Sequence, residues 1–240
     1  MRAWLERLLD PSEAIARKLQ DRVVEPAARF ITSIESFWPP TAAIIVATLL
    51  QASLPERVGQ ARWIFVALSV LLLIVVAFVN PRQIEKRHRP LRGVMLAIVA
   101  ALSLGNAVSG AQLVIDLVNG EGIHDAGTLL RTGGAIWLTN VIVFSLWYWL
   151  FDRGGPYARV HTPDPLPAFM FPQMDKPEFA PPRWRPEYVD YLYLAFTNAL
   201  AFSPTDVMPL ARWAKLTMLL QSLVSLMIAV LVIARAVNVL

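Results

Sequence analysis

The polar side chains with the strongest claim to chemistry gather near the C-terminus, in a stretch otherwise rich in aromatic and aliphatic residues. They are Thr197, Asn198, Ser203, Thr205 and Asp206, with Pro204 among them. Hydroxyl, amide and carboxylate groups at this spacing can bind a small ion or solute, or can satisfy the backbone where a helix stops. Pro204 forbids simple continuation of a helix that ends near Phe202, so the group marks a corner in the chain.

The corner at 203–206 has two interpretations. Non-helical backbone at membrane depth persists only where protein covers it or where water fills a cavity beside it. The corner is therefore either a packed helix hairpin or the border of an aqueous path. In the second case Thr197 and Asn198, on a short helix, would line a path made by several subunits, with Asn140 and Asn106 as facing polar groups.

The residues needed for disulfides, metal sites and the common catalytic motifs are absent from the sequence or not suitably spaced. The chain has no cysteine, which excludes disulfides, thiolate catalysis and cysteine-ligated metals. His88, His124 and His161 fall in three different loops without a ligand-spaced partner. The sequence contains no nucleophile elbow, HExxH motif or glycine-rich phosphate loop. We therefore predict no catalytic residue, no cofactor and no metal site, and we do not expect an enzyme.

The composition favours a membrane protein. Of the 240 residues, 56% are hydrophobic and 17% are charged, and the mean hydropathy is +0.49. Soluble domains are about half apolar and about a quarter charged. The lipid bilayer is thus the first expected partner. The formal charge of +4 is explained by basic loops on one membrane face, so we expect no nucleic acid partner.

Four apolar runs, at 37–54, 63–79, 93–118 and 129–151, predict a four-helix transmembrane region over 37–151, because a span needs about 20 apolar residues. The run that closes the chain predicts a fifth span. Asp116 lies near the end of the third run and is compatible with a proton relay, but its closeness to Val118 favours the membrane interface.

Three further segments complete the expected architecture. Residues 1–36 carry one apolar helical stripe among charges and predict an amphipathic helix that lies on the membrane or packs against a partner. Residues 152–187 hold nine prolines and predict an extended loop without ordinary helix or strand. Residues 188–240 predict a short re-entrant helix, the polar corner and the final span. Ser203, Thr205 and Asp206 are expected to supply local hydrogen bonds at the corner and to cap that final helix, with Pro209 near its first turn.

Lysine and arginine predict the orientation. With five spans and a re-entrant 188–207, one membrane side holds 18 of the 22 lysines and arginines. This bias places the N-terminus and the re-entrant segment in the cytoplasm. A full crossing by 188–207 would instead give six spans, but Asp190, Asn198 and Pro204 make that crossing costly.

The C-terminal segment resembles two families. One part of it resembles the pore-helix, filter and inner-helix order of two-helix potassium channels. The residues that carry this resemblance are Tyr193 to Thr197, then Asp206, Pro209-Leu210 and Arg212, followed by a long aliphatic helix. The filter position is occupied by Ala201 to Thr205, without glycine, so the resemblance does not imply selective potassium conduction by the TVGYG mechanism.

A closer similarity is to a bacterial inner-membrane family known only as domain of unknown function 1345. The residues that carry it are Asp190, Tyr191, Tyr193, Phe196-Thr197, Phe202, Thr205-Asp206, Arg212, Lys215 and Val237-Asn238. This resemblance implies a polytopic membrane protein and brings no activity with it.

We therefore expect an all-α integral membrane protein with five transmembrane helices and a re-entrant, pore-helix-like segment. The first hypothesis for its function is a channel-like homo-oligomer that passes small ions or solutes. The second is a non-conducting scaffold or accessory subunit that binds a protein partner through its N-terminal helix or proline-rich loop. A secondary transporter is a weaker alternative, because no inverted repeat and no midplane charge is evident.

Overall fold

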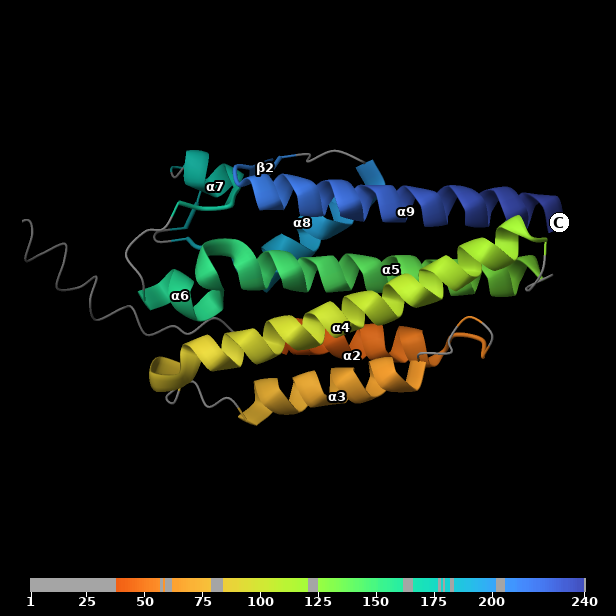
Figure 1. Cartoon of the computed structure of the whole chain (residues 1–240). Coiled ribbons are helices and arrows are strands. Elements are labelled where there is room, and N and C mark those ends of the chain that lie inside the picture. Colours follow the sequence, from red (N-terminus) through yellow and green to blue (C-terminus); the bar gives the residue numbers. More distant parts are fainter. Residues whose placement is uncertain are drawn as a thin grey trace, which may run out of the picture. The chain divides into compact units, whose positions relative to one another are not determined.

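Two long antiparallel helices, α5 (Ala126–Phe151) and α9 (Arg212–Val239), form the centre of the fold in the computed structural model of the chain. The ring of Phe151, the last residue of α5, lies 5.2 Å from that of Trp213 near the start of α9. Gly133, in the first half of α5, lies against Val232 in the last third of α9. The two helices therefore run in opposite directions along each other (Figure 1).

The structure describes residues 38–56, 58, 62–78, 84–120, 125–161, 166–176, 178, 180–181, 184–201 and 206–239. The amphipathic helix predicted over 1–36 lies outside the described residues. So do Phe179 of the proline-rich segment and the corner residues Ser203, Pro204 and Thr205.

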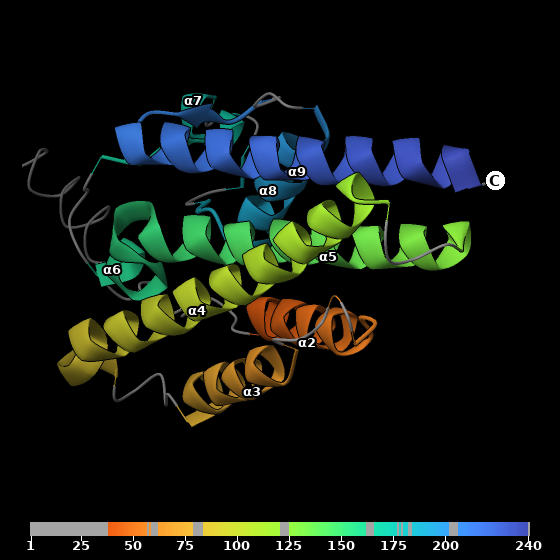
Figure 2. The ribbon, with the colours of Figure 1, turned by 45° about the vertical axis from the view of Figure 1, so that its right-hand side comes forward.

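Three helices precede α5: α2 (Trp38–Ala52), α3 (Arg62–Phe78) and α4 (Ile84–Val118). α2 and α3 pack on each other and lie on the side of α5 away from α9, whereas α4 crosses α5 obliquely (Figures 1 and 2). The buried residues of α5 run almost continuously from Thr139 to Leu146, because α2, α4, α8 and α9 cover it from different sides.

Among the described residues, three helical segments are long and apolar enough to cross a membrane: Arg92–Val118, Ala126–Gly154 and Arg212–Asn238. They correspond to three of the five predicted spans. The other two predicted spans form shorter apolar helices, Trp38–Ala52 and Arg62–Ile74. The prediction of an all-α fold with membrane-length helices is confirmed in this coarser form.

The exposed surface of these helices is strongly apolar. On α9 the exposed residues include Leu216, Leu219, Leu220, Leu223, Leu226, Met227, Val230, Ile233 and Val237. A water-soluble monomer rarely presents so continuous an apolar face, whereas a helix in contact with lipid does.

The segment 81–92 lies between the predicted spans 63–79 and 93–118 and is expected from the sequence to be a loop on the basic side of the membrane. It is instead helical for most of its length, because α4 already begins at Ile84. The segment contains Glu, Lys, Arg and Leu, which are good helix formers, and it contains no glycine or asparagine to start a turn. The helix therefore begins before the apolar run, which starts near Gly93.

The prediction that 152–187 lacks regular structure is also wrong in part. This segment contains a single turn η1 (Asp152–Gly154), α6 (Pro156–His161), strand β1 (Phe169–Met170) and α7 (Pro172–Asp175). Two of its prolines lie where helices tolerate them, since Pro156 and Pro172 are the first residues of α6 and α7. α8 (Tyr188–Ala201) follows.

β1 pairs antiparallel with β2 (Met208–Pro209), with Phe169 opposite Pro209 and Met170 opposite Met208. The backbone N–H of Leu210 donates to the carbonyl oxygen of Ala168 at 2.8 Å. The expectation that Asp206 caps the final helix is therefore wrong, because α9 begins only at Arg212, whereas Pro209 lies in β2 shortly before the first turn of α9. Proline suits this edge position because it has no N–H to donate.

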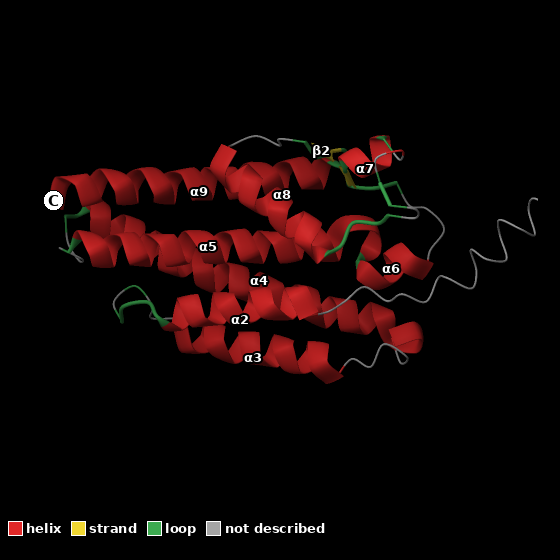
Figure 3. Ribbon diagram, turned by 180° about the vertical axis from the view of Figure 1, so that it is seen from behind, coloured by secondary structure: helices red, strands yellow, loops and turns green. Residues whose placement is uncertain are grey.

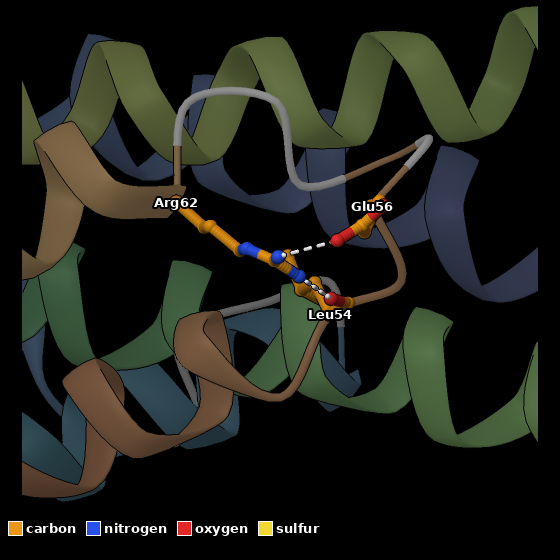
Figure 4. Close-up of polar contacts among 3 residues, drawn as sticks. All are labelled: Leu54, Glu56 and Arg62. Carbon is orange, nitrogen blue, oxygen red and sulfur yellow. Dashed lines mark hydrogen bonds and ion pairs between the residues drawn. The ribbon is translucent and has the colours of Figure 1, made fainter.

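A small polar clamp closes the connection between α2 and α3 (Figure 4). The Arg62 guanidinium donates to the carbonyl oxygen of Leu54 and to the carboxylate of Glu56, both at 3.1 Å. The Glu56 side chain is 89% exposed, so the ion pair itself contributes little. The bond to Leu54 satisfies a carbonyl that follows the end of α2.

Candidate functional site

The C-terminal hairpin consists of α8, the described residues 206–211 of the connecting segment and the first turns of α9. α8 begins beside the C-terminal end of α5, where the hydroxyls of Tyr188 and Ser145 lie 2.8 Å apart. Farther along, α8 reaches the middle of α5 at Phe196. The Phe196 ring meets the ring of Trp137 edge-on, with centroids 5.8 Å apart. β2, which follows α8 in the chain, pairs with β1 and lies again at the C-terminal end of α5 (Figure 3).

Asn198 lies at the centre of a buried hydrogen-bond network between α5, α8 and α9. Its amide nitrogen donates to the carbonyl oxygen of Met218 at 3.0 Å and to Oε1 of Gln221 at 2.8 Å. The Tyr148 hydroxyl donates to the same Gln221 oxygen at 2.7 Å. The Gln221 nitrogen in turn donates to the carbonyl oxygen of Ala195 at 2.8 Å.

The network is enclosed. Tyr148 and Gln221 are 0% exposed and Asn198 is 2% exposed. A polar group in such surroundings is costly unless it is hydrogen-bonded, and each of these three side chains is. The network therefore joins the three helices to one another.

Thr197, beside Asn198, behaves differently. Its hydroxyl donates within α8, to the carbonyl oxygens of Tyr193 at 3.0 Å and Leu194 at 3.1 Å. Its neighbours along the helix, Phe196 and Leu200, are exposed and apolar. Thr197 thus lies beside an apolar surface, and its hydroxyl is used by its own backbone.

Asp206 is the one corner residue of the predicted set that the structure describes, and it is exposed. Val207, the next residue, is 2% exposed. The structure therefore places Asp206 at the surface, close to the pairing of β2 with β1, and away from the buried amide of Asn198.

The two asparagines predicted as facing groups lie in separate contacts. Asn140 donates to the hydroxyl of Ser225 on α9 at 3.2 Å. Asn106 accepts a hydrogen bond of 2.6 Å from the Gln51 amide, which joins α4 to α2. The structure thus brings Asn198 together with Gln221 and Tyr148, and it uses Asn140 and Asn106 to join other pairs of helices.

A second polar centre, at Asp152, was missed by the sequence analysis. The Asp152 side chain is 0% exposed and accepts hydrogen bonds from the hydroxyl of Tyr191 at 2.6 Å and from the backbone N–H of Ala168 at 2.8 Å. Arg159 lies over the ring of Tyr191 at 5.1 Å and donates to the carbonyl oxygen of Trp149 at 2.7 Å. This centre ties the proline-rich segment to α5 and α8.

Aromatic rings surround Asp152 on the side of the proline-rich segment. Phe169 is 0% exposed and lies against the rings of Tyr148, Tyr191 and Trp213, at centroid distances of 5.1, 6.3 and 5.7 Å. Phe171 packs on Tyr191 at 5.4 Å and on Trp184 at 5.8 Å. The proline-rich segment is therefore anchored in the helical core rather than lying loosely on it.

The sequence did contain a signal for the first network. Gln221, Ser222 and Ser225 interrupt an otherwise aliphatic final helix, and an amide within a span needs a protein or water partner. The Asp152 centre carried a weaker signal, because a single carboxylate after an aromatic belt is common at a membrane surface. Among the described residues, no cluster of His, Cys, Asp or Glu could hold a metal ion.

The fold and this site define an all-α protein with three membrane-length apolar helices, joined through buried amide and hydroxyl groups. Comparison of the sequence with protein-family models found no match, and comparisons with curated proteins and with solved structures found none either.

Proposed function

We propose that the protein is a non-conducting membrane scaffold or accessory subunit whose C-terminal hairpin is structural. The observation that carries this proposal is the Asn198 amide, which is buried and bonded to Met218 and Gln221 within one chain. A group that lines an aqueous path must meet water, whereas this amide is closed in by its own protomer.

The remaining polar groups support the same proposal. The Thr197 hydroxyl bonds within α8, and the Asn140 amide bonds to Ser225 on α9. The Asn140–Ser225 bond is interhelical, and bonds of that kind hold membrane helices together and contribute about 0.6 kcal/mol each on average. On this view the polar residues determine which helices pack together.

We further propose five membrane crossings and a re-entrant α8. α8 has 14 residues and is thus about 21 Å long, short of the hydrocarbon thickness of about 30 Å. Its start lies beside Ser145 and the pairing of β2 with β1 lies at the same end of α5, which supports entry and exit on one side. The basic bias of the loops supports an orientation with this end of α5 in the cytoplasm. The resemblance to the bacterial inner-membrane family is the basis for proposing that membrane.

The proline-rich segment is the surface we propose for a protein partner. Its aromatic side is anchored in the core, whereas Leu166 is 93% exposed and Pro172, Asp175 and Lys176 are exposed around α7. A photo-crosslinking residue at Leu166, in native membranes, is expected to capture a partner protein. The same residue at exposed Arg131, at the opposite end of α5, serves as the control.

Cysteine labelling tests the structural hairpin, because the chain has no cysteine of its own. Single Ser225→Cys, Thr197→Cys and Asp206→Cys variants in intact membranes would be treated with a water-soluble thiol reagent. We expect Asp206→Cys to react, since that residue is exposed, and the other two to remain unlabelled. Rapid labelling of Ser225→Cys, a near-isosteric change at a 0% exposed site, would overturn the proposal.

The second candidate is the channel-like homo-oligomer. The observation that favours it is the order of elements: α8 reaches only the middle of α5, and the chain then returns to a long apolar helix. Flux through reconstituted protein that disappears in an Asp206→Ala, Thr205→Ala variant would support this candidate. Absence of flux, with an unlabelled Ser225→Cys, would support the scaffold.

A further inference from the structure

We propose that Arg153 binds the phosphate of an anionic phospholipid headgroup at the C-terminal end of α5. This inference goes beyond the scaffold function. It depends on the protein lying in a membrane, and not on whether the hairpin conducts.

The backbone at Arg153 is the first observation. Its φ of 50° and ψ of 28° lie in the left-handed region, and among the described residues it is the one residue other than glycine with positive φ. Gly154 and Gly155, which follow it, have φ of 83° and 95° and adopt such values without a Cβ clash. A non-glycine residue held in this uncommon backbone conformation is a candidate for a role of its side chain.

The hydrogen bonding of the guanidinium is the second observation. Its terminal nitrogen donates to the thioether sulfur of Met174 at 3.3 Å, and a thioether is a weak acceptor. Its Nε is buried and has no hydrogen-bond partner among the described residues. Arg159, six positions later, donates instead to the carbonyl oxygens of Trp149 and Asp152. Because Nε is enclosed, the donors that remain for an external acceptor are those of the two terminal nitrogens, one of which bonds to the Met174 thioether.

The location is the third observation. Arg153 lies at the end of the membrane-length segment Ala126–Gly154. It follows Phe151, whose ring stacks on Trp147 at 4.9 Å and contacts Trp213 at 5.2 Å. Aromatic belts of this kind lie at the level of lipid headgroups. The acceptors found at that level are phosphate oxygens, which a guanidinium binds through two parallel hydrogen bonds.

Nearby positive charge would strengthen the attraction. Arg92 reaches the same end of α5, where its Nε lies 3.4 Å from the carbonyl oxygen of Leu150. Arg212 precedes Trp213 at the start of α9. Basic side chains at a membrane surface attract anionic lipids by about 1 kcal/mol each.

A purely structural role makes a different prediction. A cation near the carbonyl end of α5 is also stabilised by the helix dipole. If that were its whole role, replacing Arg153 would lower stability to the same extent with and without anionic lipid. The experiment must therefore compare lipids as well as variants.

The test measures binding of phosphatidylglycerol, phosphatidylcholine and soluble glycerophosphate to the purified full chain in neutral detergent, by native mass spectrometry and thermal shift. We expect the unchanged protein to prefer phosphatidylglycerol. Arg153→Gln should weaken that binding about tenfold, the effect of losing hydrogen bonds to a charged group. Arg131→Gln, at the other end of α5, is the matched control and should retain full binding.

Arg153→Gly provides a second variant, because glycine relieves the strained φ and should fold at least as well as the original chain. We expect it to be no less stable without lipid and to lose the preference for phosphatidylglycerol. Equal phosphatidylglycerol binding by Arg153→Gln, Arg153→Gly and the unchanged protein would overturn the proposal. If glycerophosphate bound as strongly as phosphatidylglycerol, the site would be assigned to free phosphate esters, and the proposal of a lipid ligand would be overturned.

Discussion

The side-chain amide of Asn198 donates a 2.8 Å hydrogen bond to the side-chain oxygen of Gln221, 23 positions later in the chain. The bond joins a short helix to a long one across the segment that connects them. Each residue lies in a largely apolar helix, so each amide is satisfied only if the other helix is in place. This relationship fixes the depth at which α8 lies against α9.

The first prediction is a coupling between these two residues. Gln221→Leu leaves the buried Tyr148 hydroxyl without its acceptor and should lower the free energy of unfolding by about 1–3 kcal/mol. Asn198→Leu leaves the Gln221 oxygen with its bond from Tyr148 and should cost less, about 0.5–1.5 kcal/mol. The double variant should lose less than the sum of the single losses, by about 0.6–1.7 kcal/mol. Reversible unfolding of the four proteins in mixed micelles measures this coupling.

Thr197→Val is the matched control for that cycle. The Thr197 hydroxyl bonds only within α8, so its loss should change stability little and should show no coupling to Gln221→Leu. Strict additivity of Asn198→Leu and Gln221→Leu would mean that the 2.8 Å contact does not contribute to stability.

The second prediction concerns the close approach of α5 and α9. A Cβ atom at Gly133 would lie 2.6 Å from a methyl carbon of Val232, far inside van der Waals contact. Gly133→Ala should therefore push the helices apart and destabilise the protein by about 1–3 kcal/mol, in spite of alanine's better helix propensity. Thermal unfolding in detergent measures the effect.

The neighbouring glycine provides the control. A Cβ at Gly134 meets nothing within 4 Å, so Gly134→Ala should be neutral or slightly stabilising. Val232→Ala should rescue Gly133→Ala by removing the methyl groups that clash. If Gly133→Ala and Gly134→Ala were equally tolerated, α5 and α9 would not pack as closely at Gly133 as the structure shows.

Apolar runs predicted the positions of the helices well, because a span is defined by length and hydrophobicity along one continuous segment. α3 begins at Arg62 and the predicted run at Trp63, and α5 ends at Phe151 as expected. The extension of α4 to Ile84 was missed, because hydropathy is blind to a helix that continues outside the apolar region.

The pairing of distant segments was not predictable from one sequence. Nothing local to Phe169 or Pro209 indicates that their backbones pair across 39 intervening residues. The hydrogen-bond partners were also not predicted. Asn198 stands out in the sequence as a polar group in an apolar helix, but its partner Gln221 lies on another helix. Such contacts depend on how the helices pack, which periodicity alone does not determine.

The third prediction concerns Asp152. Asp152→Ala removes the acceptor of the Tyr191 hydroxyl and of the Ala168 backbone N–H, both buried. The proline-rich segment should then detach from the core, at a cost of about 1–3 kcal/mol for each buried donor left unsatisfied. Limited proteolysis and hydrogen exchange over 166–176 should both increase. Asp175→Asn, an exposed change in the same segment, should leave both measurements unchanged.

The last prediction concerns the pH dependence of the N-terminal end of α5. The carboxylate of Asp125 accepts a hydrogen bond of 2.6 Å from the backbone N–H of Thr128, and hydrogen bonds from Thr128 hold the pKa of Asp125 below its ordinary value of 3.8. Its stabilisation is therefore fully present above pH 3.8 and is lost as the pH falls through the lower folded-state pKa. The stability difference between the unchanged protein and Asp125→Ala, measured by unfolding over this range, should shrink as the pH falls. Asp125→Asn, which caps a helix without titrating, should show no such pH dependence, and a constant difference for Asp125→Ala would mean that the charged form is not preferred at this cap.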